Sequence, residues 1–128
     1  MNTLKTPVAA VIGHPITHSK SPRMHNFWLE QFGIEGYYIP LDIDPKKFER
    51  SVRNLSELGL VGANITIPYK EKVLKIADKI SDRAALVGAA NTLTFLQNGG
   101  VYADNTDGYG FLQNIKSKYS DWSAREGI

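Results

Sequence analysis

The sequence predicts an α/β fold: a three-layer α/β/α domain with a mainly parallel sheet and an antiparallel edge hairpin. Short β-type runs alternate with helix-type segments along the 128 residues. That alternation is typical of a parallel sheet covered by helices on both faces. Near the carboxyl end, Asn98-Gly99-Gly100 separates two β-type runs. Residues of these types accept positive φ, so this segment indicates a tight hairpin.

Local signals place each element in turn. Ser21 is expected to cap the first helix, with Pro22 in its first turn and Gly33 at its end. Asp44-Pro45 opens a second helix that ends at Gly59. We expect strands at 7–12, 37–41, 63–67, 91–96 and 101–103, and further helices at 70–80, at 82–87 and from 107 onward.

Composition bounds the function. The length fits one domain (1–118), and the polar residues 119–128 resemble the start of a linker. A net charge of +2 without a basic stripe argues against nucleic acid. The absence of cysteine fits a cytoplasmic location, and the first apolar run is too short for a membrane span or a signal peptide. A homodimer is compatible with the sequence, which leaves the oligomeric state open.

Polar residues follow three of the expected strands. Lys70 comes after the third strand and Asp107 after the last, with Thr66 and Thr106 beside them. Ligands bind at the carboxyl ends of strands in α/β folds, and an ammonium paired with a carboxylate can move a proton to or from a hydroxyl. Singly, each residue is an ordinary helix-start or capping residue. Together they predict a site for a small polyhydroxylated substrate.

Ser19 and Ser21 mark the end of the first strand. Two hydroxyls at the amino end of a helix suit a carboxylate, because the hydroxyls donate and the helix dipole favours an anion. Ser21 alone could serve only as the helix cap. A serine-nucleophile hydrolase is the weaker reading, because the sequence lacks a nucleophile elbow.

Two other patterns do not predict sites. His14, His18 and His25 are close in sequence, but Pro15 blocks a helical arrangement and no carboxylate is nearby, so we expect no metal. Gly108-Tyr109-Gly110-Phe111-Leu112-Gln113 resembles a dinucleotide fingerprint, but its third glycine position holds glutamine.

Four motifs in order resemble the amino-terminal, substrate-binding domain of the shikimate dehydrogenase family: Gly13-His14-Pro15-Ile16-Thr17-His18-Ser19-Lys20-Ser21-Pro22, Asn64-Ile65-Thr66-Ile67-Pro68-Tyr69-Lys70, Gly88-Ala89-Ala90-Asn91-Thr92 and Asn105-Thr106-Asp107-Gly108. The family pattern often has Val at Ala90 and Phe at Tyr69, which leaves the polar groups unchanged.

The resemblance implies a role for each polar position. Lys70 would be the catalytic acid/base and would also bind the substrate, with Asp107 as its catalytic partner. The implied substrate-binding residues are Ser19 and Ser21 for a carboxylate, Thr66, Asn91 and Asp107 for ring hydroxyls, and Thr106 as a minor contact. Asp82 would touch an NADP cofactor. The resemblance implies that a dinucleotide-binding domain, missing from this chain, would follow the linker at 119–128 and hold most of this cofactor. The implied reaction is the reversible reduction of 3-dehydroshikimate to shikimate with NADPH. Use of quinate, a preference for NAD, and a stand-alone shikimate-binding module without catalysis remain open alternatives.

Overall fold

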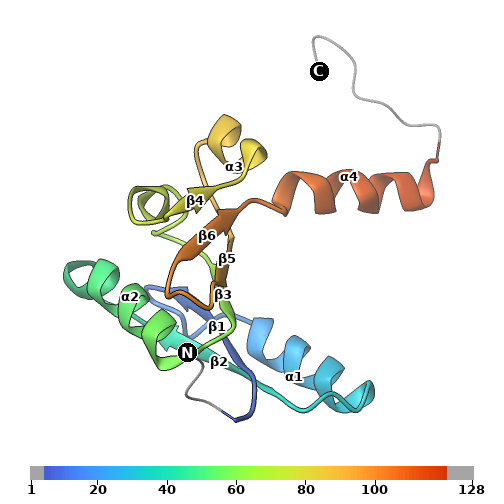
Figure 1. The fold of residues 1–128 in the computed structure, drawn as a ribbon. Coiled ribbons are helices and arrows are strands. Elements are labelled where there is room, and N and C mark those ends of the chain that lie inside the picture. The colour runs from blue at the N-terminus through green and yellow to red at the C-terminus, as the bar shows by residue number, and fades with distance from the viewer. Residues whose placement is uncertain (1–4, 121–128) are drawn as a thin grey trace.

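The computed structural model describes residues 5–120, which form a six-stranded sheet with helices on both faces (Figure 1). The strand order is β2-β1-β3-β5-β6-β4. Only β5 runs against the other described strands, so the predicted mainly parallel sheet is confirmed. In chain order the elements are β1 (Val8–Gly13), α1 (Ser21–Gln31), β2 (Tyr37–Asp42), the 3₁₀ turn η1 (Pro45–Lys47), α2 (Phe48–Leu58), β3 (Gly62–Ile65), the 3₁₀ turn η2 (Lys72–Lys75), β4 (Lys79–Ile80), α3 (Asp82–Val87), β5 (Thr92–Phe95), β6 (Val101–Asp104) and α4 (Asp107–Lys118).

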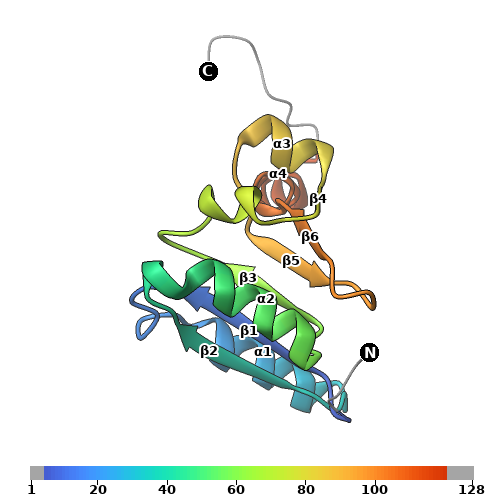
Figure 2. The ribbon, with the colours of Figure 1, turned by 60° about the vertical axis from the view of Figure 1, so that its left-hand side comes forward.

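The layers follow from the period-two alternation of β1, which sends successive side chains to opposite faces of the sheet. Ala10 and Ile12 belong to the main core together with Phe48 of α2. Val11 packs instead with Tyr38 on the other face. Figure 2 shows α2 in front of β1–β3 and α1 behind them. The three-layer arrangement predicted from the sequence is therefore present.

The predicted helix at 70–80 is wrong. Only Lys72–Lys75 is helical, as a 3₁₀ turn, and Lys79–Ile80 forms β4 at the sheet edge outside β6. Asp78 explains the change, because its backbone N–H donates to the Val101 carbonyl and its carboxylate accepts from the Val101 N–H, each at 2.8 Å. The backbone after the 3₁₀ turn thus pairs with β6 rather than continuing a helix. The helical spacing of Val73, Leu74 and Ala77 predicted that they face inward, and Val73 is indeed fully buried.

Ser21 does not cap α1, contrary to the prediction. The cap position is Lys20, and no side chain caps the helix there. Ser19 Oγ instead accepts a hydrogen bond from the Ser21 N–H at 3.3 Å, because the chain turns into the helix one residue earlier than expected. Pro22 does lie in the first turn.

The hairpin turn and the helix ends agree with the sequence, but the predicted edge position of the hairpin is wrong, because β4 pairs with β6 and forms the edge instead. Gly99 has φ +85° in the β5–β6 turn, and Gly59 has φ +95° after α2, a conformation that L side chains rarely adopt. In Figure 1, α4 extends away from the sheet, and it ends at Lys118. The expected linker at 119–128 falls mostly outside the described residues, and its role stays a prediction. None of the helices in residues 5–120 has the length and apolar character needed to cross a membrane.

Candidate active site

Four chain segments meet at one edge of the sheet, where β1, β3 and β6 end and the antiparallel β5 begins. Backbone hydrogen bonds tie them together: His14 N–H donates to the Ile67 carbonyl at 3.1 Å, and Ile65 N–H donates to the Asn91 carbonyl at 2.8 Å. The reversed direction of β5 brings Asn91, which precedes a strand, to the edge where the other strands finish. The segments bearing the predicted site residues are therefore neighbours.

Lys70 and Asp107 form an ion pair across this edge. Lys70 Nζ lies 2.8 Å from Asp107 Oδ2, and the two side chains are 37% and 54% exposed. Tyr69, only 1% exposed and stacked on Phe48 at 3.9 Å between ring centroids, anchors the residue before Lys70. The pair predicted from strand ends is formed, and solvent and a small ligand can reach both charged groups.

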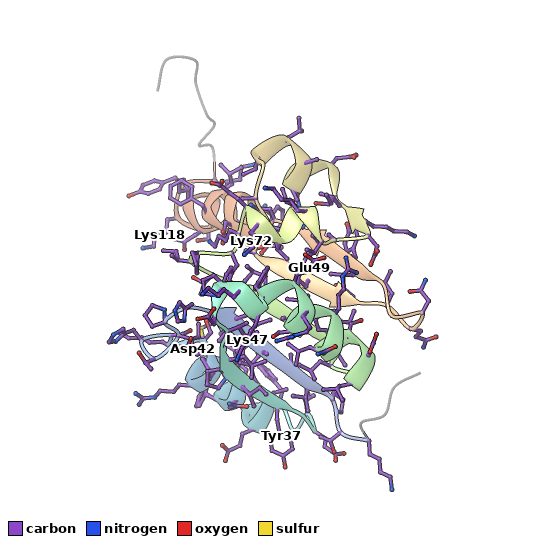
Figure 3. The ribbon with its side chains drawn as sticks, turned by 90° about the vertical axis from the view of Figure 1, so that its left-hand side faces the viewer. Tyr37, Asp42, Lys47, Glu49, Lys72 and Lys118 are labelled. Atoms are coloured by element: carbon purple, nitrogen blue, oxygen red, sulfur yellow. The ribbon has the colours of Figure 1, made fainter. Side chains whose placement is uncertain are left out.

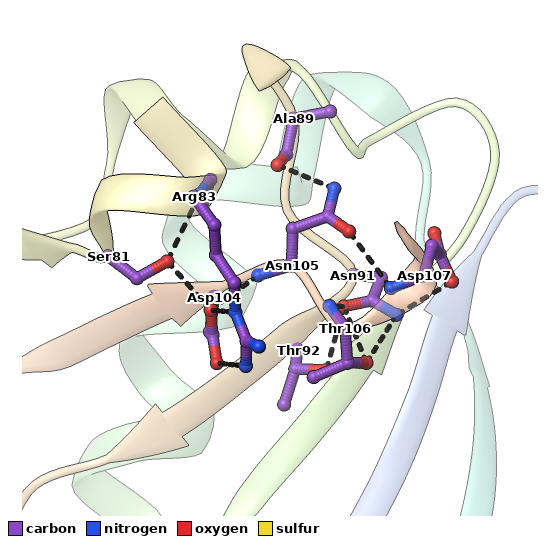
Figure 4. Close-up of polar contacts among 10 residues, drawn as sticks. Ser81, Arg83, Ala89, Asn91, Thr92, Asp104, Asn105, Thr106 and Asp107 are labelled. Carbon is purple, nitrogen blue, oxygen red and sulfur yellow. Dashed lines mark hydrogen bonds and ion pairs between the residues drawn. The ribbon is translucent and has the colours of Figure 1, made fainter. Parts of the chain in front are cut away.

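Asn91 connects this ion pair to Thr106 (Figure 4). Its Nδ2 donates to Asp107 Oδ1 and to Thr106 Oγ1, each at 2.9 Å. Its Oδ1 accepts from the Thr106 N–H at 2.9 Å and from Thr92 Oγ1 at 2.9 Å. Lys70, Asn91, Thr106 and Asp107 thus form one hydrogen-bonded cluster of ammonium, carboxamide, hydroxyl and carboxylate. Such a cluster can bind vicinal hydroxyls and exchange a proton with one of them.

Asp104, which was not among the predicted site residues, carries a second carboxylate at the end of β6. Asp104 accepts two bonds from Arg83, at 2.7 and 2.6 Å, one from Ser81 Oγ at 2.7 Å and one from the Asn105 N–H at 2.8 Å (Figure 4). The Arg83 guanidinium holds the pKa of Asp104 well below its usual range, with Ser81 and Asn105 adding to the effect. Arg83 reads as an ordinary surface residue in sequence, and only its position opposite the end of β6 reveals the contact.

The serine loop lies beside a buried phenol. Burial raises the pKa of Tyr38 to about 12, and a hydrogen bond with the Ser21 side chain partly opposes the rise. The Tyr38 hydroxyl donates to Asn64 Oδ1 at 2.7 Å. The ring stacks on His25 with 4.1 Å between centroids, so this histidine lies against the core. Ser19 and Ser21 are both half-buried at the start of α1.

The expectation that no carboxylate lies near the histidines is wrong. His14 Nδ1 lies 2.6 Å from Asp42 Oδ1, and Asp42 Oδ2 accepts from the Ile16 N–H at 3.2 Å. Asp42 ends β2, which pairs with β1 so that Asp42 stands opposite Gly13. Figure 3 shows Asp42 beside the loop that follows β1. Hydrogen bonding by His14 lowers the pKa of Asp42. Within residues 5–120, no three side chains of the metal-binding types gather.

Thr66 and Asp82 lie outside the hydrogen-bonded cluster. Thr66 N–H donates to the Ile12 carbonyl at 2.9 Å, which holds the residue at the end of β3. Its hydroxyl bonds to no other described residue and is available to a ligand. Asp82 is exposed at the start of α3, without a hydrogen bond or ion pair to the described residues of the cluster.

An apolar groove of about 540 Å³ lies between α1 and the sheet, lined among others by Trp28, Phe32 and Leu93. Neither Lys70 nor Asp107 lines it. Because the Lys70–Asp107 ion pair lies at the strand ends instead, we place the site there.

The start of α4 does not fit a dinucleotide pyrophosphate. Its first residue carries the Asp107 carboxylate, which repels phosphate, and the Asp107 N–H is already bonded to Asn105 Oδ1 at 3.0 Å. Both features oppose the use of this helix end as an anion site. The described residues therefore offer a site for a polar substrate, and they offer no phosphate-binding loop.

Fold and site together define an α/β domain with a lysine–aspartate ion pair at the carboxyl ends of its strands. The family model for the shikimate dehydrogenase substrate binding domain matches residues 11–93. The chain belongs to this family.

Known proteins of the same kind resemble the chain over nearly its whole length. It is 53% identical over 127 residues to the shikimate dehydrogenase (NADP(+)) of Roseobacter denitrificans, covering 99% of this chain and 46% of that relative. A crystal structure of a shikimate dehydrogenase in complex with NADP+ superimposes with a TM-score of 0.89 at 34% identity, covering 98% of this chain and 43% of that one. The Thermus thermophilus enzyme in complex with NADP(H) and shikimate gives a TM-score of 0.83 at 36% identity, with 88% and 42% covered. The chain thus spans less than half the length of these relatives.

Proposed function

We propose that this chain is the substrate-binding and catalytic half of an NADP-dependent shikimate dehydrogenase, which reversibly reduces 3-dehydroshikimate to shikimate. The observation that carries the proposal is the Lys70–Asp107 ion pair at 2.8 Å, bonded through Asn91 to Thr106. The family membership and the relatives named as NADP-dependent enzymes support the choice of reaction and cofactor.

Each side chain has a separate task in the proposed reaction. Ser19 and Ser21 donate to the substrate carboxylate, and Thr66, Asn91 and Asp107 bind the ring hydroxyls, with Thr106 as a minor contact. Asp107 orients the Lys70 ammonium through the ion pair at 2.8 Å. Lys70 donates its proton to the ketone oxygen as that oxygen becomes an alkoxide, and in the reverse direction it accepts the hydroxyl proton.

NADPH, when bound, supplies the hydride that reaches the ketone carbon. The described residues lack a fitting phosphate site, so the cofactor is held mainly by residues outside this chain. Asp82, exposed at the start of α3, is the residue of this chain that we assign to cofactor contact. Protonation by Lys70 is therefore the half of the reaction that this domain performs.

Isothermal titration calorimetry tests the proposal. The 128-residue chain is titrated separately with shikimate, quinate and NADP. We expect weak but saturable binding of shikimate and much weaker binding of NADP. The absence of shikimate binding at millimolar concentrations would contradict the site. Binding of quinate as tight as that of shikimate would support a quinate/shikimate dehydrogenase, and binding without activity in any longer form of the protein would support a stand-alone binding module.

A further inference from the structure

Asn105 is a buried side chain between β6 and α4, and it contacts neither charged group of the ion pair. It is 7% exposed. Its carboxamide makes two hydrogen bonds of 3.0 Å, in which Nδ2 donates to the Ala89 carbonyl and Oδ1 accepts from the Asp107 N–H (Figure 4). The oxygen of the side-chain amide therefore binds the backbone of Asp107, and its nitrogen binds the turn before Asn91.

The turn before Asn91 is itself hydrogen-bonded to Lys70. The Ala89 carbonyl and the Ala90 N–H belong to one peptide unit, which is planar and rigid. Ala90 is fully buried, and its N–H donates to the Lys70 carbonyl at 2.7 Å. Three hydrogen bonds, each 3.0 Å or shorter, therefore join the Asp107 backbone to the Lys70 backbone through one carboxamide and one peptide.

The ion pair cannot set its own geometry. Both side chains are more than a third exposed, and exposed pairs contribute little because solvent screens them and the long lysine loses entropy when held. Proton transfer nevertheless requires the two groups to be held within a fraction of an ångström of the productive position. The spacing of the two backbones must therefore be fixed by groups that are buried and hydrogen-bonded.

We propose that Asn105 is a positioning residue that sets the separation of Lys70 and Asp107 through the Ala89–Ala90 peptide. The inference rests on the proposed function of this site. A carboxamide is the short side chain that offers a donor and an acceptor at once. Replacing Asn105 by aspartate keeps an acceptor for the Asp107 N–H but removes the donor. The ionised carboxylate then places a negative charge against the partly negative oxygen of the Ala89 carbonyl.

The test compares Asn105→Asp with Asn98→Asp in the 128-residue chain. Asn98 Oδ1 also accepts a backbone N–H two residues on, that of Gly100 at 2.8 Å, but in the exposed hairpin turn. The two variants carry the same chemical change, but only Asn105 is linked to the ion pair by hydrogen bonds. We expect Asn105→Asp to weaken shikimate binding by roughly tenfold or more in calorimetry, the effect of one lost buried hydrogen bond. Asn98→Asp should leave it unchanged.

A double-mutant cycle separates positioning from general destabilisation. In an Asp107→Asn background, Asn105→Asp should add less than about twofold, because coupled residues are not additive. An equal loss in both backgrounds would overturn the positioning role. As the pH is lowered, the new carboxyl regains a donor by protonation, so the affinity relative to wild type at each pH should recover for Asn105→Asp. Asn105→Ser, which keeps an acceptor but is too short to reach Ala89 as well, should show the same loss without recovery.

A crystal structure of the Asn105→Asp protein gives a readout that needs no ligand. The distance between Lys70 Nζ and Asp107 Oδ2, 2.8 Å here, should lengthen beyond hydrogen-bonding range. An unchanged distance would overturn the inference, whatever the affinity. Failure of the wild-type chain to bind shikimate would instead contradict the proposed function, and the crystallographic distance would still decide the role of Asn105.

Discussion

Replacing Lys70 by alanine separates proton transfer from substrate binding. The substitution removes the ammonium that lies 2.8 Å from Asp107 Oδ2. The bonds from Asn91 to Asp107 and Thr106 do not involve Lys70, so the groups proposed to hold the ring remain in place. We expect Lys70→Ala to reduce turnover by roughly 10²–10⁴-fold, the usual contribution of a positioned general acid/base. The Michaelis constant for shikimate should change far less.

The structure also limits how far Lys70→Ala can lower the stability of the fold. A tenfold loss of rate corresponds to about 1.4 kcal/mol of activation free energy, so the expected loss amounts to roughly 3–6 kcal/mol. The ion pair is partly exposed and contributes at most about 1 kcal/mol to folding. A turnover defect of the expected size therefore cannot arise from unfolding, and thermal melts of the variant should stay near the wild-type value.

The assay follows NADP reduction by shikimate in a fusion of this chain to the remaining segment of the Roseobacter denitrificans relative. Lys72→Ala is the matched control, because Lys72 Nζ donates to the Pro45 carbonyl at 3.0 Å and lies outside the cluster. Asp107→Asn should lower binding and turnover together, since it removes both the charge beside Lys70 and an acceptor for a ring hydroxyl. Near-normal turnover of Lys70→Ala, with Asp107→Asn inactive, would show that the roles are reversed.

Three further predictions concern binding, stability and the isolated chain. Ser19→Ala and Ser21→Ala should each raise the Michaelis constant by the equivalent of about 1.5–3 kcal/mol with little change in turnover, because the carboxylate has the same charge in the ground and transition states; a collapse of turnover at constant Michaelis constant would contradict this. Asp104→Asn should lower the thermal midpoint at neutral pH. The folded pKa of Asp104 is depressed, so its stabilisation is present above the unfolded value of 3.8 and is lost as the pH falls toward the lower folded pKa. The variant should therefore show a flatter dependence of midpoint on pH below about pH 4 than wild type, and parallel curves would contradict the role of Arg83. The purified chain alone should show no NADP-dependent turnover, and activity in a spectrophotometric assay would overturn the assignment of the cofactor site to residues outside it.

Local patterns in the sequence were sufficient for most of the fold. Several features depend on backbone preferences within a few residues: the helix ends at Gly33 and Gly59, the hairpin turn at Gly99 and the start of α4 at Asp107. The same locality explains the failure at 70–80. Its helical spacing correctly predicted the burial of Val73, but the choice between helix and strand was made by hydrogen bonds to Val101, which is 23 residues from Asp78.

The sequence by itself determined where the residues of the proposed site fall along the chain, because strand ends and helix starts fix the positions of Lys70, Asn91, Thr106 and Asp107. Tertiary structure decided which of them come into contact. The Lys70–Asp107 bond spans 37 residues and the Asn91–Asp107 bond spans 16, and the pairing of β3, β5 and β6 brings these side chains into contact. The Asp42 partner of His14, 28 residues away, and the two-sided hydrogen bonding of Asn105 also depend on strand pairing and burial. No local pattern encodes the His14–Asp42 and Asn105–Ala89 bonds, because they join segments 28 and 16 residues apart.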